Sequence, residues 1–588
     1  VRTLVDAILA APGPAVLATS RESTGAIGEQ LYGLSPLDPE TAGVELFLAR
    51  ARERDVDFDP RGDDLEAVRE VCRRLDGVPL AIELAAAWVR VLSPTELVER
   101  LDDRFRVLRG GRRGGRHETL RDTIRWSYEQ LDETEAALFD RLSVFAGGCT
   151  LDAVNEICAG EGEDPMDTLD TLMVLVNKSM LTTQRGTGRI RFTMLETLRQ
   201  FGQEQLDHTG ASETYFDRHA DYFASMVSRE SDQLISAKES ETWEHLSREW
   251  PNIRAAFDSI LATRDHDRAA RLVLELGDFA ALSMRFELFE WLDDLLAAAP
   301  VEERADAGAL LGLAAIRSYL TVRPDRVEMA ERALAADPSD PYGFARIALA
   351  AEYLNNVHDP ERAEVITSDW LTHLDTARPA TRMWGHGMRA FHLVLIGEAE
   401  RAAEQAALLR EIADRTGSAS ANALAYWAEG MVIALTDLDG GEIAWDQGLD
   451  AARSVHPVHL VVHLIVGLII HFSAARGELP DVLDRCRAIL DEAMEHHYLA
   501  GTGHLMGVTA IVLARAGDPA TGARLIGAME ANGHLPRPNA VRAIERAGGA
   551  DLAGAKASGA RLSIKEAGTV ALAALDEAIA TITSTEDE

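Results

Sequence analysis

The chain has far fewer basic than acidic residues. It carries 59 lysines and arginines against 96 aspartates and glutamates, a net charge of −37 at pH 7. Such a charge opposes nonspecific contact with nucleic acid and favours solubility. Cysteine is also scarce: Cys72, Cys149, Cys158 and Cys486 show no Cys-x-x-Cys spacing. We therefore expect small buried thiols in a reducing cytoplasm, with neither disulfides nor a metal site.

Long apolar runs are missing as well. The longest, Val458 to Phe472, is interrupted by His459, His463 and His471, whereas a membrane span needs about 20 residues with few polar groups. We expect a buried helix there and no membrane partner. His459 and His463 lie four residues apart, but no helix glutamate completes a His-Glu-x-x-His motif, so we expect no metal there. The first residues lack the basic and apolar segments of a signal peptide.

A phosphate-binding loop is absent from the start of the chain. The segment from Pro14 to Arg21 has the pattern of a short apolar strand that ends in small polar residues and one guanidinium. Open α/β sheets present groups to a ligand at that point. No Gly-x-x-x-x-Gly-Lys-Ser/Thr sequence precedes it, and the chain begins with valine. We interpret the sequence as a fragment whose phosphate loop and acidic strand lie upstream.

A second motif opens an apolar helix after a charged one. Gly77-Val-Pro-Leu80 follows the charged stretch from Leu65 to Leu75, and Ile82, Leu84 and Ala85 continue at helical spacing. A glycine that ends one helix and a proline that begins the next explain this backbone without any ligand.

Further downstream the order of segments is that of a winged helix. Two helical stretches, at 119–128 and 138–145, precede Leu175-Val-Asn-Lys-Ser179 and a hairpin from Met180 to Met194. The hairpin turns at Arg185-Gly-Thr-Gly188, and Arg189-Ile-Arg-Phe192 alternates as a half-buried strand does.

From about Ala211 onward the pattern is one of consecutive helices. Turn-then-helix units recur at a spacing of roughly 35–42 residues, which suits a solenoid of paired helices; they lie at Pro324-Asp325, Asp359-Pro360, Gly397-Glu398, Asp439-Gly440, Gly477-Glu478 and Gly517-Asp518. Small and apolar residues at helical spacing predict close packing of neighbouring helices. Asn252, within Trp250-Pro-Asn-Ile253, is expected to cap a helix that leads into the repeats.

Together these motifs resemble the STAND family of NB-ARC-like signal-transduction ATPases, in the form found in actinobacterial-type LuxR-family, SARP-type or cyclase-linked regulators. The resemblance covers nearly the whole chain except the Walker A and B part. It implies that Thr19, Ser20 and Arg21 are a sensor facing the terminal phosphate, since arginine grips phosphate oxygens in pairs. It also implies nucleotide contacts at three lid residues, Gly77, Pro79 and Leu80. The alternative for Arg21 is a surface arginine after an edge strand.

The resemblance assigns two further segments. Met194, Leu195 and Glu196 take the place of a Met-His-Asp triplet that reads a bound diphosphate in relatives; leucine cannot hydrogen-bond phosphate, so Met194 and Leu195 are expected in the core. The dense basic run from Arg104 to His117 is expected to be a glycine-rich hinge. Alternatively, its Arg112, Arg113 and Arg116 approach nucleotide phosphate or an acidic face of the repeats.

The expected fold is mainly α. We expect a remnant of an α/β P-loop ATPase, a helical lid, a winged helix, a tetratricopeptide-like α-solenoid and a C-terminal helical cap with an acidic tail, at residues 1–40, 41–110, 111–205, 211–545 and 546–588. ATP or ADP with Mg would bind the complete parent protein. This chain is expected to bind neither tightly and not to hydrolyse ATP, because the residues that neutralise phosphate charge are missing.

The expected function is regulatory. The nucleotide module would switch between two states, and the repeats would sense a protein or small-molecule inducer, with nucleotide-dependent assembly as in relatives. The chain would be part of a transcriptional or cyclase-linked regulator and would not contact DNA directly. One alternative is a nucleotide-independent interaction scaffold of winged helix and repeats. A further alternative is a repressor that binds DNA through the winged helix.

Overall fold

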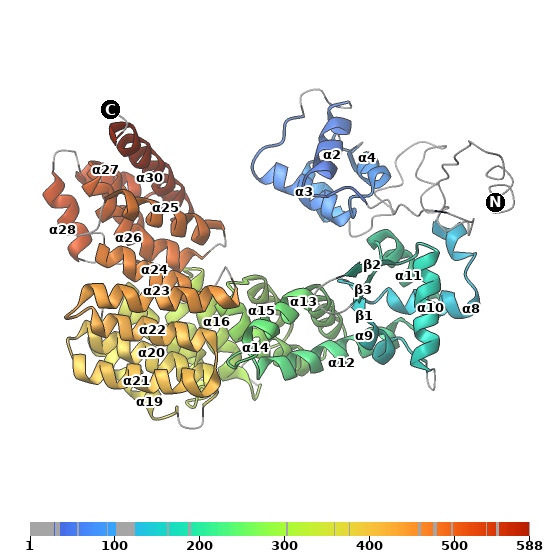
Figure 1. Ribbon diagram of the computed structural model, residues 1–588, viewed down its shortest axis with the longest axis horizontal. Coiled ribbons are helices and arrows are strands. Elements are labelled where there is room, and N and C mark those ends of the chain that lie inside the picture. The colour runs from blue at the N-terminus through green and yellow to red at the C-terminus, as the bar shows by residue number, and fades with distance from the viewer. Residues whose placement is uncertain are drawn as a thin grey trace. The chain divides into compact units, whose positions relative to one another are not determined.

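A computed structural model describes most of the chain (Figure 1). The described residues are 29, 36–53, 55, 58–86, 88–90, 92–100, 124–160, 164–185, 190–301, 304–357, 359–374, 377–456, 460–473, 479–495, 498–534, 536, 538–548 and 552–586. The chain divides into two compact units, which are described separately: Val1–Phe223 with Glu249–Ser259, and Ala224–Arg248 with Ile260–Glu588.

The first described helices of unit 1 form a small helical subdomain, which we call the lid after the expectation for residues 41–110. Its helices are α2 (Ala42–Arg52), α3 (Asp63–Arg74), α4 (Pro79–Ala86) and α5 (Pro94–Arg100). Three acids open α3 and two arginines close it, so both ends of the helix dipole are matched by charge. The apolar stripe of each helix turns inward around a core that includes Phe47, Val71 and Ile82, all fully buried.

The winged helix follows in the same unit. It comprises α8 (Glu133–Leu142), β1 (Cys149–Thr150), α9 (Leu151–Ile157), α10 (Pro165–Asn177), β2 (Thr182–Arg185), β3 (Ile190–Thr193) and α11 (Glu196–His208). Asp132 and Glu135 form a capping box at the start of α8. The three strands are antiparallel in the order β1-β3-β2, with Thr182 opposite Thr193. The hairpin expected between Met180 and Met194 is therefore confirmed.

The alternation expected along β3 is wrong in detail. Ile190 is 54% exposed, whereas Arg191 is only 9% exposed. Arg191 turns inward because Glu249 accepts a two-pronged ion pair from it, with Nη2 to Oε2 at 2.8 Å. The carbonyl oxygens of Gly147 and Gly148 accept its remaining donors at 2.9 and 3.1 Å. A buried charge is tolerated when it is paired and hydrogen-bonded in this way.

Two long helices, α12 (Ser212–Ser231) and α13 (Glu239–Ala262), contribute residues to both units. The remaining helices of unit 2 form the solenoid: α14 (His266–Leu282), α15 (Glu287–Ala298), α16 (Ala307–Leu320), α17 (Arg326–Ala336), α18 (Phe344–Ala351), the π-helix η2 (Glu352–Asn356), α19 (Pro360–Leu371), α20 (Pro379–Leu395), α21 (Ala399–Thr416), α22 (Ala419–Ile433), α23 (Leu438–Val455), α24 (Leu460–Ser473), α25 (Leu479–Glu495), α26 (Leu499–Arg515), α27 (Pro519–Ala531), α28 (Pro538–Ala547), α29 (Leu552–Gly559) and α30 (Ile564–Glu586).

The repeat pattern is confirmed at the described turns, with one shift, whereas the expected turn at Gly477-Glu478 lies outside the described residues. Asp359 and Asp518 cap α19 and α27 through their side chains, close to the turns that the sequence indicates. Helix α23 begins two residues early, because Asp437 rather than Asp439 caps it. Figure 1 shows α20 to α23 stacked in one part of the solenoid, and each of these helices packs against the next one in the chain. This is the arrangement of an α-solenoid.

Two smaller expectations concern burial. All four cysteines are buried, and burial raises the pKa of the Cys72 thiol to about 12 and that of Cys486 to about 11. The apolar stretch that begins at Val458 forms α24, whose described side chains are largely buried. None of the helices within the described ranges combines the length and hydropathy that crossing a bilayer requires.

Candidate functional site

The turn between α3 and α4 has an unusual backbone. Asp76 and Gly77 both adopt left-handed conformations, with φ of 52° and 64°. The Gly77 carbonyl accepts the amide of Leu37 at 3.0 Å. A Cβ on Gly77 would lie 1.8 Å from the Leu37 carbonyl oxygen, so only glycine fits. Pro79 then begins α4, which matches the backbone interpretation of the Gly77-Val-Pro-Leu80 motif.

The start of α11 lacks a cap of its own. Leu195 occupies the N-cap position and offers no side-chain acceptor. The backbone N–H of Glu196 instead donates to Oδ2 of Asp76 at 2.5 Å, across 120 residues of sequence. A carboxylate at a helix N-terminus satisfies an unpaired donor and complements the helix dipole. Asp76 of the lid therefore caps the last helix of the winged helix.

Charged neighbours surround this contact. Arg199, one turn into α11, donates from Nε to Oε2 of Glu196 at 2.7 Å. Burial lowers the pKa of Arg199, and the nearby Asp76 carboxylate acts against that shift. The cluster alternates acid, base and acid: Asp76, Arg199 and Glu196. Separating the lid from α11 would leave both Arg199 and the first amide of α11 with one fewer partner.

The predicted site residues are only partly brought together. Gly77 is buried and Pro79 is exposed, and Leu80 lies in the first turn of α4. Met194 and Leu195 are half-buried rather than in the core, because they link β3 to α11 and belong to the inward face of neither. The other predicted residues lie outside the described part of the chain; they are Thr19, Ser20, Arg21, Arg112, Arg113 and Arg116.

Sequence reasoning missed Asp76 and mistook the role of Asn252. An aspartate directly before a glycine at a helix end was the available signal for Asp76, since aspartate tolerates left-handed backbone. Asn252 does not cap a helix: it lies inside α13, after Pro251. Its side chain is fully buried, and its Oδ1 accepts the amides of Ala146 and Gly147 at 2.9 and 3.1 Å. Asn252 thereby holds the loop before β1 in place, and no local sequence pattern predicts this contact.

The helix that would enter a DNA groove is acidic. In a helix-turn-helix the second helix reads the bases, and here that helix is α10. Asp167 and Asp170 are exposed on it, as are Met166 and Met173, at 61% and 55%. Its neighbouring Lys178 is bound to Glu135 at 2.6 Å. Because the exposed charges described on α10 are negative, this helix would mainly repel the phosphate backbone of DNA.

Comparisons with known proteins agree with this architecture. Residues 131–207 match the family model of the winged helix-turn-helix domain. The chain is 35% identical over 369 residues to "Putative HTH-type transcriptional regulator Rv0890c" of Mycobacterium tuberculosis, covering 59% of this chain and 41% of that protein. It is 38% identical over 220 residues to "Uncharacterized protein Rv0894" of the same organism, covering 37% of this chain and 56% of that protein. The chain thus spans about half the length of these relatives.

Among solved structures, a STAND protein with a tetratricopeptide repeat sensor from Pyrococcus horikoshii aligns with a TM-score of 0.41. The identity is 14%, over 89% of this chain and 74% of that one. The winged-helix match at 131–207 is followed in the chain by the helical repeats. The chain therefore contains a winged helix-turn-helix domain that precedes a solenoid of helical repeats, and it is similar to a mycobacterial protein named as a putative HTH-type transcriptional regulator.

Proposed function

We propose that this chain is the regulatory part of a STAND-type switch within a transcriptional regulator. The observation that carries the proposal is the hydrogen bond from the Glu196 amide to Asp76. It joins the lid motif to the winged-helix segment that replaces the Met-His-Asp triplet. A contact between two modules, made by one side chain at one helix end, is a suitable two-state element: it either forms or is replaced by water.

Nucleotide is proposed to act at the lid motif in the parent protein. ATP or ADP with Mg would bind that motif together with a phosphate-binding loop and an acidic strand of the family's kind. Leu195 offers no hydrogen bond to a phosphate, so the winged helix would report on nucleotide through the Asp76 contact instead. We propose that this chain by itself neither binds nucleotide tightly nor hydrolyses it.

The repeats are the proposed receiver of the signal. Solenoids present extended surfaces to ligands and partners, and the described helices of unit 2 supply one. A protein or small-molecule inducer would bind there and shift the lid contact, with assembly into oligomers as a further consequence. Transmission from repeats to lid requires that the inducer bind one arrangement more tightly than the other.

The Asp76 contact can be tested in the full chain by distance measurement. Spin labels on Asp63→Cys and Glu133→Cys report the lid and the winged helix; both positions are exposed, and the native cysteines are buried. Asp76→Gly removes the acceptor and tolerates the left-handed backbone. We expect a longer or broader distance distribution than in wild type. Asp76→Asn, which keeps an acceptor oxygen, is the matched control and should retain most of the native distribution.

Equal distributions in wild type and Asp76→Gly would overturn the switch and leave the scaffold as the better interpretation. Nucleotide is titrated in the same samples by calorimetry. We expect no saturation by ATP or ADP with Mg below about 1 mM, which corresponds to roughly −4 kcal/mol. Saturation in the micromolar range would contradict the proposal that this chain by itself does not bind nucleotide tightly.

DNA binding by the winged helix is the competing function, because the family match and the names of the relatives both point to it. The acidic face of α10 argues against it. Titration of labelled duplex DNA at low and moderate salt separates the two, since genuine phosphate contacts weaken steeply with salt. Salt-sensitive binding that Asp167→Lys strengthens would revive the repressor.

A further inference from the structure

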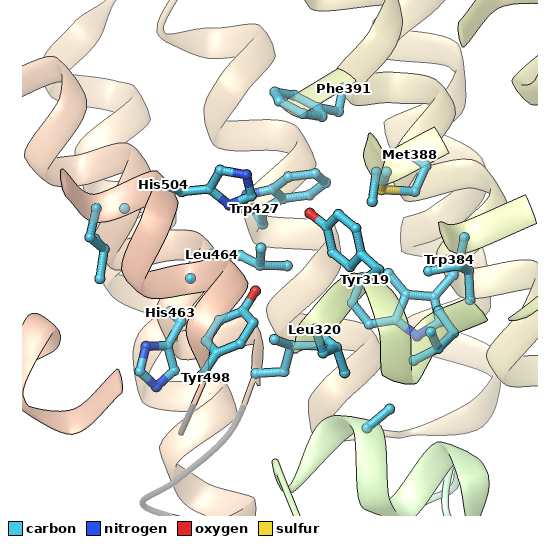
Figure 2. A pocket seen from close by; sticks show the side chains of 18 of the residues that line it. Tyr319, Leu320, Trp384, Met388, Phe391, Trp427, His463, Leu464, Tyr498 and His504 are labelled. Carbon is cyan, nitrogen blue, oxygen red and sulfur yellow. The ribbon is translucent and has the colours of Figure 1, made fainter. Parts of the chain in front are cut away.

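Unit 2 contains a cavity of about 200 Å³ between helices of the solenoid. The even-numbered helices from α14 to α26, here called the inner helices, all contribute side chains to it, and Met529 of α27 and Ala540 of α28 complete the wall. Figure 2 shows side chains from several of these helices arranged around the same space. For comparison, an engineered apolar cavity of about 150 Å³ holds benzene. The space therefore suits a molecule of one or two rings.

The wall is unusually rich in aromatic side chains. Six of the lining residues are Phe, Trp or Tyr, although these types make up only 6% of the chain; they are Tyr319, Phe344, Trp384, Phe391, Trp427 and Tyr498. Aromatic faces and edges pack well against another ring and add about 0.5–1.5 kcal/mol per pair beyond area burial. Such a wall selects a planar, apolar ligand.

The described part of the wall offers no free charge. Asp278 is the one described lining residue with an ionisable carboxylate; it is 5% exposed, and Arg378, outside the lining, binds it at 3.0 Å. Lysine, arginine and glutamate are absent from the lining residues that the structure describes. Burying an unpaired charge is costly, so a charged ligand would be rejected.

Three buried nitrogens in the lining lack hydrogen-bond partners within the described part of the chain. They are the indole Nε1 of Trp427 and both ring nitrogens of His463, whose residues are 4% and 5% exposed. Nε2 of His463 lies 3.5 Å from Oε1 of Glu492. Buried polar groups in native proteins are nearly always bonded, and an exception needs a reason such as a ligand. Figure 2 shows Trp427 and His463 among the side chains around the space, with Tyr319 and Tyr498 also bordering it. An indole N–H donates, so it calls for an acceptor on the ligand.

We infer that this cavity is a binding site for a small, uncharged aromatic molecule that carries a hydrogen-bond acceptor. The inference rests on the proposed sensing role of the repeats and gives that role a ligand class. It names the cavity between the inner helices as the place where the inducer binds.

Gly467 provides a variant that fills the cavity without disturbing the fold. It lines the space from within α24, and a Cβ placed on it meets nothing within 4 Å. A leucine there would extend into open volume while improving helix propensity. Gly467→Ala makes the same improvement but leaves most of the space open, and it is therefore the matched control.

The test uses two fluorescent probes that share one skeleton. 2-Naphthol has two rings, is uncharged at neutral pH and carries an acceptor oxygen, and 6-hydroxynaphthalene-2-sulfonate adds a sulfonate. We expect the full chain to bind the neutral probe saturably with one site and the sulfonate at least ~10-fold more weakly, because the described wall offers no cation. Gly467→Leu should weaken binding of the neutral probe at least ~10-fold. Gly467→Ala should bind it with the affinity of wild type.

Trp427 is tested with uncharged 2-naphthaldehyde, whose carbonyl supplies the acceptor. Trp427→Phe keeps a ring but removes the N–H, and we expect affinity to fall about 3- to 10-fold, as for one hydrogen bond. Retained binding in Gly467→Leu, or equal binding of the neutral and sulfonated probes, would overturn the site. Saturable binding that leaves the spin-label distances unchanged would uphold the site while contradicting its coupling to the lid.

Discussion

Asp76 caps a helix to which it does not belong. Its Oδ2 lies 2.5 Å from the backbone nitrogen of Glu196, the first residue of α11. The residue that holds the N-cap position, Leu195, has no acceptor to give. One carboxylate thus serves both the left-handed turn of the lid and the end of a winged-helix element, which links the stability of α11 to the position of the lid.

Hydrogen exchange at the start of α11 measures how much this cap stabilises the helix. N-caps contribute about 0.5–2 kcal/mol. Asp76→Gly should therefore speed exchange of the Glu196 amide, by about 5- to 30-fold if the loss is 1–2 kcal/mol. Asp63→Asn, an exposed acid of α3, serves as the control. Unchanged exchange in Asp76→Gly would mean that another group satisfies the amide.

Gly77 should tolerate no side chain. Its φ of 64° and the 1.8 Å separation between the Leu37 carbonyl oxygen and an added Cβ act together in Gly77→Ala. We expect a loss of roughly 2–4 kcal/mol in unfolding free energy, from strained backbone plus a clash that must move the chain. Chemical denaturation followed by circular dichroism gives the value.

Gly210, which follows α11, is the matched control for that experiment. Its φ of 71° is similarly left-handed, but a Cβ there meets nothing within 4 Å. Gly210→Ala should lose only the conformational part, about 1–2 kcal/mol. If both variants lose the same amount, the close approach of Leu37 does not constrain Gly77.

Asp140 should make the winged helix less stable as pH rises from about 4 to about 7. Burial raises the pKa of Asp140 from its ordinary value of 3.8 to about 7, against the opposing effects of Tyr128, which donates to Oδ2 at 2.9 Å, and Arg141. Below about pH 3 the carboxyl is largely neutral in both the folded and the unfolded chain. As pH rises, the unfolded chain loses its proton first, so folding weakens by up to about 1.4 kcal/mol per pH unit.

Asp140→Asn removes that titration. The stability of the variant relative to wild type should therefore increase from pH 4 to pH 7 and level off above it, as measured by urea unfolding at a series of pH values. Asp170→Asn, at an exposed position on α10, should show no such trend. A flat difference between Asp140→Asn and wild type would show that Asp140 ionises normally in the fold.

The pair formed by Arg191 and Glu249 should behave as a buried ion pair. The two side chains are only 10% and 6% exposed. Arg191→Met leaves Glu249 buried without its cation and should lose about 3–5 kcal/mol, whereas replacing both residues with apolar ones of similar size should lose much less. Thermal unfolding of the two single variants, one at Arg191 and one at Glu249, and of the double variant completes the double-mutant cycle. Additive losses would show that the residues do not interact.

Much of the architecture could be predicted because its signals are local. The Asp132–Glu135 capping box, the hairpin between Met180 and Met194 and the aspartates that open repeat helices each act within a few residues. Burial of α24 follows from its composition. The glycine-proline turn at residues 77–79 likewise follows from the backbone preferences of those two residue types.

The sequence by itself therefore determined the order of the winged helix and the repeats, the repeat pattern and the starts of several repeat helices. Only the tertiary structure decided that Asp76 caps α11, that Arg191 rather than Ile190 turns inward, that Asn252 binds the loop before β1 from inside a helix, and that the inner helices of the repeats enclose an aromatic cavity. The physical reason is the distance along the chain over which each interaction acts. Capping and periodicity depend on neighbours in sequence, whereas these contacts join groups far apart in the chain and exist only once the elements have packed.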